Sequence, residues 1–125
     1  MIKLLAVATG GAIGSIGRYL LSLTAEKIAG LNFPAGTFAV NIIGSLLIGF
    51  CWSYFDKIHI SNEFRLFVFT GFLGGFTTFS TFTRESAQFI KAGESGYAVS
   101  YMLVSNIVGL SAVFLGFYLS HRILR

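Results

Sequence analysis

A ten-residue segment, Gly74–Thr83, combines the side chains best suited to interact with a small polar solute. It contains two glycines, five hydroxyl residues and three phenylalanines, in the order GGFTTFSTFT. Glycine frees the backbone, hydroxyls donate and accept hydrogen bonds, and phenylalanine rings present edges with partial positive charge. Lipid tolerates a helix broken in this way only where protein or water satisfies the freed backbone groups. The segment therefore predicts a place where something small and polar passes or binds.

The sequence around this segment is that of an integral membrane protein. Of the 125 residues, 54% are hydrophobic and 11% are charged, whereas a soluble domain averages about 25% charged residues. A spanning helix needs about 20 apolar residues, so the chain accommodates four with short loops. We predict an all-α fold, with one four-helix transmembrane domain over residues 1–125.

The four helices are expected from about Lys3 to Leu23, from Pro34 or Thr37 to Tyr54, from Glu63 or Arg65 to Phe89, and from Tyr97 to Ser120. The double glycine and the hydroxyls that follow it make a continuous third helix doubtful. We expect two half-helices that meet between Gly74 and Phe79.

Charge and cysteine content exclude several classes of protein. The net charge is +4, but the Lys and Arg residues are scattered at segment ends, which fits bilayer anchoring rather than nucleic-acid binding. Between the two sides of the membrane they divide five against four, a weak bias that permits insertion in both orientations. Cys51 is the only cysteine, so no disulfide forms within one chain. The N-terminus resembles a signal peptide, but its apolar character resumes beyond Arg18, which indicates a retained first helix.

Four polar residues inside or at the edge of the apolar stretches are candidate functional groups. Arg18 and Glu85 either extend to the membrane surface from helix ends or line a vestibule, where Arg18 attracts an anion and Glu85 shapes the opening or pairs with Arg84 or Arg18. Asn41 and Asn106 each need a partner, either in another helix as packing contacts or along a transport path.

Enzymatic chemistry is not expected. A serine or threonine nucleophile would need a base within hydrogen-bond reach, and the only histidines, His59 and His121, fall in a loop and at a helix end. The sequence has no cysteine and histidine cluster for zinc and no phosphate-binding loop after a strand.

Taken together, these residues resemble the Fluc family of fluoride channels, the CrcB-type membrane proteins of microbes. The resemblance runs nearly end to end and is strongest in the third helix, at residues 71–82. The matching residues are Gly10-Gly11-Ala12-Ile13-Gly14 and Arg18-Tyr19, then Gly36-Thr37, Val40-Asn41 and Gly44, and finally GFLGGFTTFSTF at 71–82.

The resemblance implies a passive fluoride channel in the inner membrane, built as a homodimer of two antiparallel copies with two pores and one central, structural sodium ion. Main-chain carbonyls of Gly74 and Thr77 from each subunit would bind the sodium. Phe79 and Phe82 match the pore phenylalanines, and Asn41 matches an amide that helps to coordinate the anion. Arg18 and Glu85 match charged positions of the family, while Ser105, Asn106 and Ser111 are candidates for a polar track in the fourth helix.

Fluoride is small and strongly hydrated, so a path for it must replace water with many hydrogen-bond donors. The residues that could supply them are Thr37, Asn41, Ser80, Thr81 and Ser105.

Two alternative functions stay open. A proton-coupled small drug exporter of four-helix antiparallel type needs a membrane-embedded carboxylate, and the first helix has none before Glu26. A structural membrane subunit would use its small-residue faces only for packing.

Overall fold

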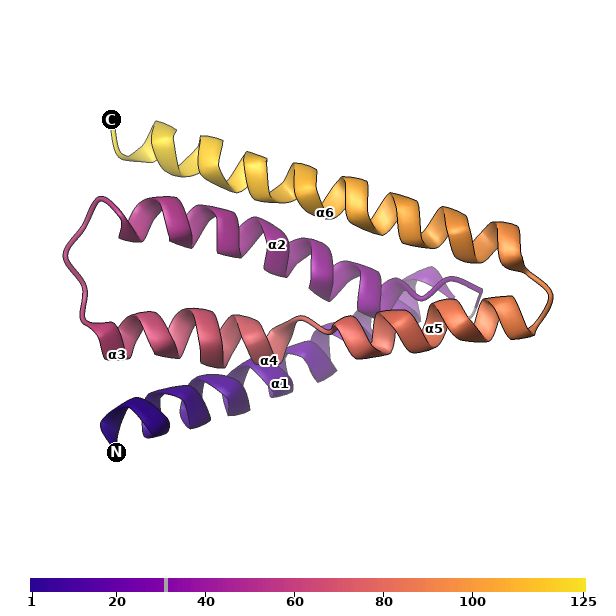
Figure 1. Ribbon diagram of the computed structural model, residues 1–125, viewed down its shortest axis with the longest axis horizontal. Helices are drawn as coiled ribbons and strands as arrows, with labels where there is room; N and C mark the ends of the chain where they lie inside the picture. Colours follow the sequence, from indigo (N-terminus) through magenta and orange to yellow (C-terminus); the bar gives the residue numbers. More distant parts are fainter. Residues whose placement is uncertain (31) are drawn as a thin grey trace.

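The computed structural model describes residues 1–30 and 32–125, and in these residues the fold is entirely helical (Figure 1). The helices are α1 (Ile2–Ala29), α2 (Ala35–Phe55), α3 (Asn62–Arg65), the π-helical η1 (Leu66–Leu73), α4 (Gly74–Phe76), α5 (Phe79–Lys91) and α6 (Ser95–Ile123). The segments from α3 to α5 form one interrupted span, so four spans are long and apolar enough to cross a membrane. Both termini and the loop between α2 and α3 lie at the same end (Figure 1).

The third span is broken at Thr77 and Thr78. Both residues are extended, with φ/ψ of −87°/158° and −147°/112°, and a new helix begins at Phe79. The break falls inside the predicted interval. The expectation that the double glycine interrupts the helix is wrong. Gly74 and Gly75 are helical, and the positive-φ residues of the described chain are Gly30 and Gly93, both in loops.

The glycines near the break allow close helix approach instead. A Cβ atom on Gly75 would lie 2.7 Å from the carbonyl oxygen of Gly11, and one on Gly71 would lie 2.8 Å from that of Val7. The backbones of α1 and the third span therefore touch, as small residues permit in membrane proteins. In the same way, α2 and α6 meet at Gly49 and Gly116.

Three helices were predicted too short. α1 continues to Ala29 rather than Leu23, the third span reaches Lys91 rather than Phe89, and α6 covers Ser95–Ile123 rather than Tyr97–Ser120. Helices extend beyond the hydrocarbon wherever their sequence permits, so apolar length alone underestimates them. The α1 helix ends at Ala29, and the next residue, Gly30, caps it with a φ of 81° that suits only glycine.

Replacing Gly116 by alanine is expected to destabilise the fold, because the added Cβ would overlap the backbone of Leu46 and Phe50 in α2. Overpacking of this kind costs about 1–3 kcal/mol. Unfolding in detergent, followed by circular dichroism, measures the loss. Gly96→Ala is the matched control in the same helix, because a Cβ there meets nothing within 4 Å. Equal stability of the two variants would contradict the close packing of α2 on α6.

Candidate functional site

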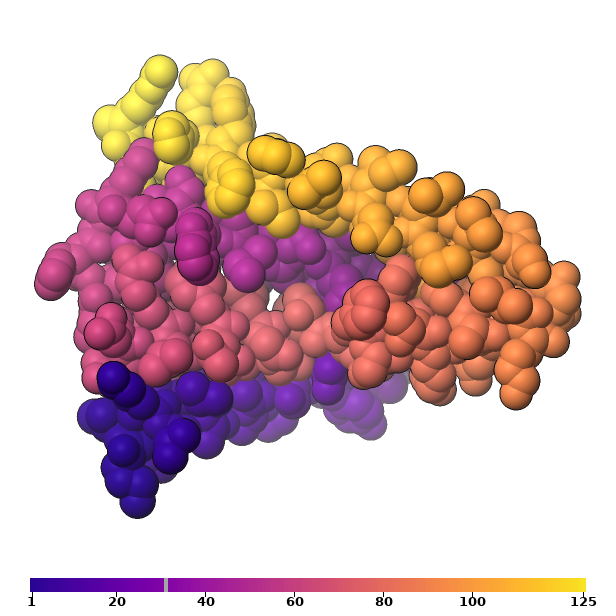
Figure 2. Space-filling model, in the orientation of Figure 1, coloured from indigo at the N-terminus to yellow at the C-terminus, as the bar shows by residue number. Residues whose placement is uncertain are grey.

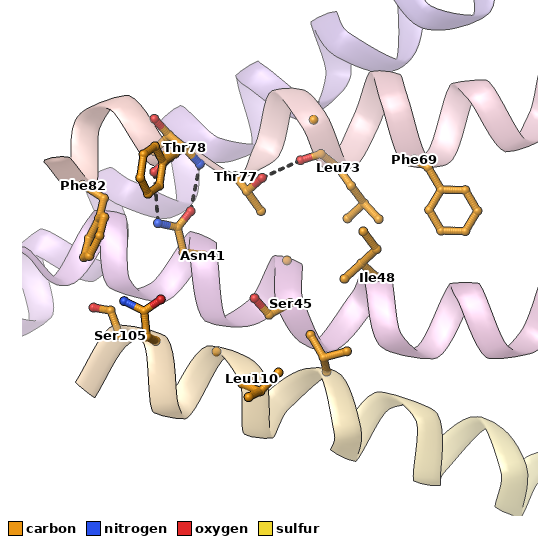
Figure 3. Close-up of a pocket in the computed structure, with 16 residues that line it drawn as sticks. Asn41, Ser45, Ile48, Phe69, Leu73, Thr77, Thr78, Phe82, Ser105 and Leu110 are labelled. Carbon is orange, nitrogen blue, oxygen red and sulfur yellow. Dashed lines mark hydrogen bonds between the residues drawn. The ribbon is translucent and has the colours of Figure 1, made fainter. Parts of the chain in front are cut away.

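The break in the third span is held by the side chain of Asn41 in α2. The Asn41 Nδ2 atom donates to the carbonyl oxygen of Thr78 at 3.1 Å, and the Thr78 amide donates to Asn41 Oδ1 at 2.8 Å (Figure 3). This side-chain amide thus pairs with both backbone groups of an extended residue, in the manner of a neighbouring strand. The predicted role of Asn41 as a contact between helices is confirmed, and its partner is the backbone of the break.

Thr78 also begins the second half of the span. Its side-chain oxygen accepts a hydrogen bond from the Thr81 amide at 3.3 Å, the usual arrangement of a threonine N-cap. The same hydroxyl donates to the Thr81 hydroxyl at 3.0 Å and lies 3.5 Å from that of Ser80. The predicted donors Ser80 and Thr81 are therefore gathered around Thr78.

These contacts leave two carbonyl groups without their helical partners. In an unbroken α-helix, the amide of residue i+4 bonds the carbonyl of residue i. The Thr78 amide, the partner of the Gly74 carbonyl, is taken by Asn41, and the Thr81 amide, the partner of the Thr77 carbonyl, is taken by Thr78 Oγ1. Freed carbonyls at a helix break are sodium ligands in transporters, so the predicted pair fits that ion. Within residues 1–30 and 32–125, no group of three or more His, Cys, Asp or Glu gathers to hold a metal by side chains.

A cavity of about 560 Å³ lies beside the break, between α2, the third span and α6. Figure 2 shows a hollow beside the middle of the third span. Polar and aromatic residues line the cavity near the break, and small and aliphatic residues line the rest. The lining residues used below are Asn41, Ser45, Gly74, Thr77, Thr78, Phe79, Phe82, Ser105, Asn106 and Gly109.

The two predicted pore phenylalanines sit next to each other at this cavity. The ring centroids of Phe79 and Phe82 are 6.0 Å apart, and Phe82 packs on Tyr101 of α6 at 5.1 Å. Phe82 is buried, whereas the Phe79 side chain is 76% exposed in the single chain. One ring is thus fixed by its neighbours, and the other lines the cavity while most of its surface is exposed.

Arg18 of α1 also contacts the break. Its Nη1 atom donates to the Thr77 carbonyl oxygen at 3.5 Å, a long contact. The pairing of Glu85 with Arg84 or Arg18 is not observed, since the only ion pair of the described residues joins Arg65 and Asp56 at 3.8 Å. Glu85 lies next to buried Thr37 and lines a separate cavity of about 340 Å³. Arg18 therefore lies at the break, whereas Glu85 lies at this second cavity.

The candidates in α6 differ from one another. The Ser105 hydroxyl is buried with no hydrogen-bond partner in the described chain. Asn106 lines the cavity but donates to Met102 of its own helix at 2.7 Å. Ser111 is exposed and donates to the Ile107 carbonyl at 2.8 Å. Of the three, Ser105 has the hydroxyl that is free to bind a solute.

Three residues of the site were missed from the sequence, namely Thr78, Tyr101 and Ser45. Thr78 comes directly before the second half-helix, and threonine is one of the residues preferred at such an N-cap position. Tyr101 and Ser45 lie one helical turn from Ser105 and Asn41, so the four-residue period could have identified both. The Tyr101 hydroxyl is also buried without a partner in the described chain.

Four apolar spans, one of them broken beside a cavity that polar side chains line in part, define a small multi-pass membrane protein of the channel or transporter type. The particular family follows from comparison. Residues 5–117 match the model of the family described as CrcB-like protein, Camphor Resistance (CrcB), and the chain belongs to this family. In bacteria, a multi-pass protein of this family is located in the inner membrane.

Curated relatives cover almost the whole chain, and those described here each carry the name fluoride-specific ion channel FluC. A relative from Desulfotalea psychrophila is 52% identical over 99% of this chain and 96% of its own length. One from Agrobacterium fabrum is 46% identical, with 98% and 99% covered, and one from Aquifex aeolicus is 42% identical, with 94% and 96% covered.

Replacing Asn41 by leucine is expected to loosen the break, because the Thr78 amide and carbonyl would both lose their partners. Each unpaired group costs about 1–3 kcal/mol. Hydrogen exchange resolved at the Thr78 amide should become faster, with a smaller change at amides within η1. Asn106→Leu is the control, since Asn106 bonds only its own helix. Slow exchange of the Thr78 amide in Asn41→Leu, equal to that in the control, would contradict the role of Asn41.

Proposed function

We propose that this chain is a fluoride-selective channel that lets fluoride leave the cytoplasm passively, and that it works as an antiparallel homodimer with a structural sodium ion at its centre. The family is one of ion channels rather than enzymes, by the names of its curated relatives. The observation that carries the proposal is the cavity at the broken span, where hydrogen-bond donors and a phenylalanine pair meet.

The donors at the break suit a small, strongly hydrated anion. Asn41 uses one N–H of its amide on Thr78 and retains the second, so it can hold the break and still donate to a solute. The Ser105 hydroxyl faces the same cavity without a protein partner in the described chain. Fluoride gains more from such donors than a larger halide does, because its charge is more concentrated.

The phenylalanine pair supplies attraction without a buried cation. Ring edges carry partial positive charge and can face an anion, and the desolvation cost of a buried lysine is avoided. Phe82 is held against Tyr101, and Phe79 extends from the subunit. If the exposed Phe79 ring faced lipid, it could not contribute to an ion path. We therefore propose that a second copy of the chain covers this ring.

The sodium ion is proposed at the carbonyls of Gly74 and Thr77, which lack their helical partners. Two antiparallel copies would bring four such oxygens together. When bound, sodium offsets the repulsion among these carbonyls and adds fixed positive charge near the anion paths. Asn41 and Thr78 contribute by keeping the amides that would otherwise occupy these oxygens.

The exporter alternative is weakened by the position of Glu26. The longer α1 does include this carboxylate, but Glu26 lies in the last turn, beside Gly36 at the start of α2. A proton-coupled exporter needs its carboxylate near the middle of the membrane. A purely structural subunit would leave the freed carbonyls and the unpartnered Ser105 hydroxyl without a use.

Purified protein reconstituted into liposomes is expected to release trapped fluoride when a potential allows net efflux, and to release chloride far more slowly. A fluoride electrode measures the rate, and protein-free vesicles give the background. Efflux equal to that background, from protein that is folded and dimeric, would reject the channel.

Replacing Phe79 or Phe82 by isoleucine is expected to lower fluoride efflux by about tenfold or more, equivalent to about 1.4 kcal/mol of lost ring-edge stabilisation. The dimer should persist on size exclusion. Phe114→Ile is the control, because Phe114 is 61% exposed on α6 and does not line the cavity. Unchanged efflux in both pore variants would refute the role of the ring edges.

A further inference from the structure

Ser45 lies on the cavity face of α2, one turn beyond Asn41 (Figure 3). Residues four apart occupy the same face of a helix, so Asn41 and Ser45 follow one another along the cavity. Ser45 is half-buried there. A hydroxyl in this position either bonds its own helix or faces the solute space.

The hydroxyl of Ser45 is not used by its helix. Serine and threonine in helices often donate to the carbonyl of the preceding turn. Elsewhere in the chain, Thr24 does so at 3.0 Å, Ser86 at 2.9 Å and Ser111 at 2.8 Å. Among the hydrogen bonds of residues 1–30 and 32–125, none involves the Ser45 side chain, so its O–H remains available to the cavity.

The facing stripe of α6 lacks a polar group at the level of Ser45. Tyr101, Ser105 and Gly109 are spaced one turn apart, and the first two have buried hydroxyls without protein partners in the described chain. Gly109 has no side chain to continue the series. A Cβ atom built on Gly109 would lie 3.6 Å from Ser45 Oγ. The Ser45 hydroxyl of α2 therefore lies close to where the side chain of a larger residue at position 109 would begin.

We propose that Ser45 is a further fluoride-coordinating residue, which supplies the donor that α6 lacks at Gly109. The inference rests on the proposed function and extends the path along α2, towards the end of the molecule that holds the termini. A desolvated anion that leaves the Ser105 hydroxyl then meets the Ser45 hydroxyl next, without a gap in its coordination.

The test compares fluoride efflux from liposomes for wild type, Ser45→Ala, the double variant Ser45→Ala with Gly109→Ser, and Thr24→Ala. The double variant moves the hydroxyl from α2 to α6, and the 3.6 Å spacing leaves room for the new Cβ. Thr24→Ala is the control, because it removes a hydroxyl that is exposed, bonded to its own helix and outside the cavity lining. Size exclusion establishes that each variant is a folded dimer. If Ser45→Ala fails this check, Ser45→Cys, which keeps the volume and weakens the donor, replaces it.

Ser45→Ala is expected to slow efflux by about tenfold, the effect of losing one hydrogen bond to a charged group. The double variant should recover to within about threefold of wild type, and Thr24→Ala should stay within about twofold. Wild-type efflux in Ser45→Ala would overturn the inference. So would a double variant as slow as Ser45→Ala, because the serine would then act through packing. An inactive wild type would reject the proposed function itself, and this inference with it.

Discussion

The organisation of this protein depends on how a backbone break is satisfied inside a membrane. In hydrocarbon, an unpaired amide or carbonyl costs several kcal/mol, so a span can be interrupted only where protein groups replace the lost helical bonds. Asn41 provides this replacement for Thr78 by pairing with both its amide and its carbonyl. A single side chain on a neighbouring helix thus makes the extended pair Thr77–Thr78 tolerable, and the carbonyl groups that the break frees become available for other partners.

Packing and chemistry are coupled through this break. Glycine contacts hold α1 against the third span and α2 against α6, so Asn41 and the α6 hydroxyls face the break from fixed helices. Because Asn41 and Thr78 Oγ1 take the amides of Thr78 and Thr81, the carbonyls of Gly74 and Thr77 lack their helical partners, and that of Thr77 accepts only the long contact from Arg18. The second half of the span then begins with the rings of Phe79 and Phe82 beside the cavity. Cation site and anion path are, in this proposal, two consequences of one interruption.

The sequence predicted the four spans and the interval of the break, because hydropathy and the run of hydroxyls are local signals. It did not predict which residues become extended. Two adjacent glycines favoured a flexible hinge, yet Gly75 is helical and serves contact with Gly11. The extended state of Thr78 depends on Asn41, 37 residues away, which no local pattern reveals. The four-residue period relates Ser45 to Asn41 and Tyr101 to Ser105, but the packing of α2 on α6 decides that these faces border the site. The positions assigned to sodium and fluoride stay predictions.

The most direct test is a density map of the protein in a lipid bilayer with sodium and fluoride present, at a resolution that separates backbone carbonyls from amides. It should show Thr77 and Thr78 extended, the Asn41 amide against the Thr78 backbone, and cation density at the carbonyls of Gly74 and Thr77. A continuous third helix, with the Thr78 amide bonded to the Gly74 carbonyl and Asn41 turned away, would contradict the interpretation at its base.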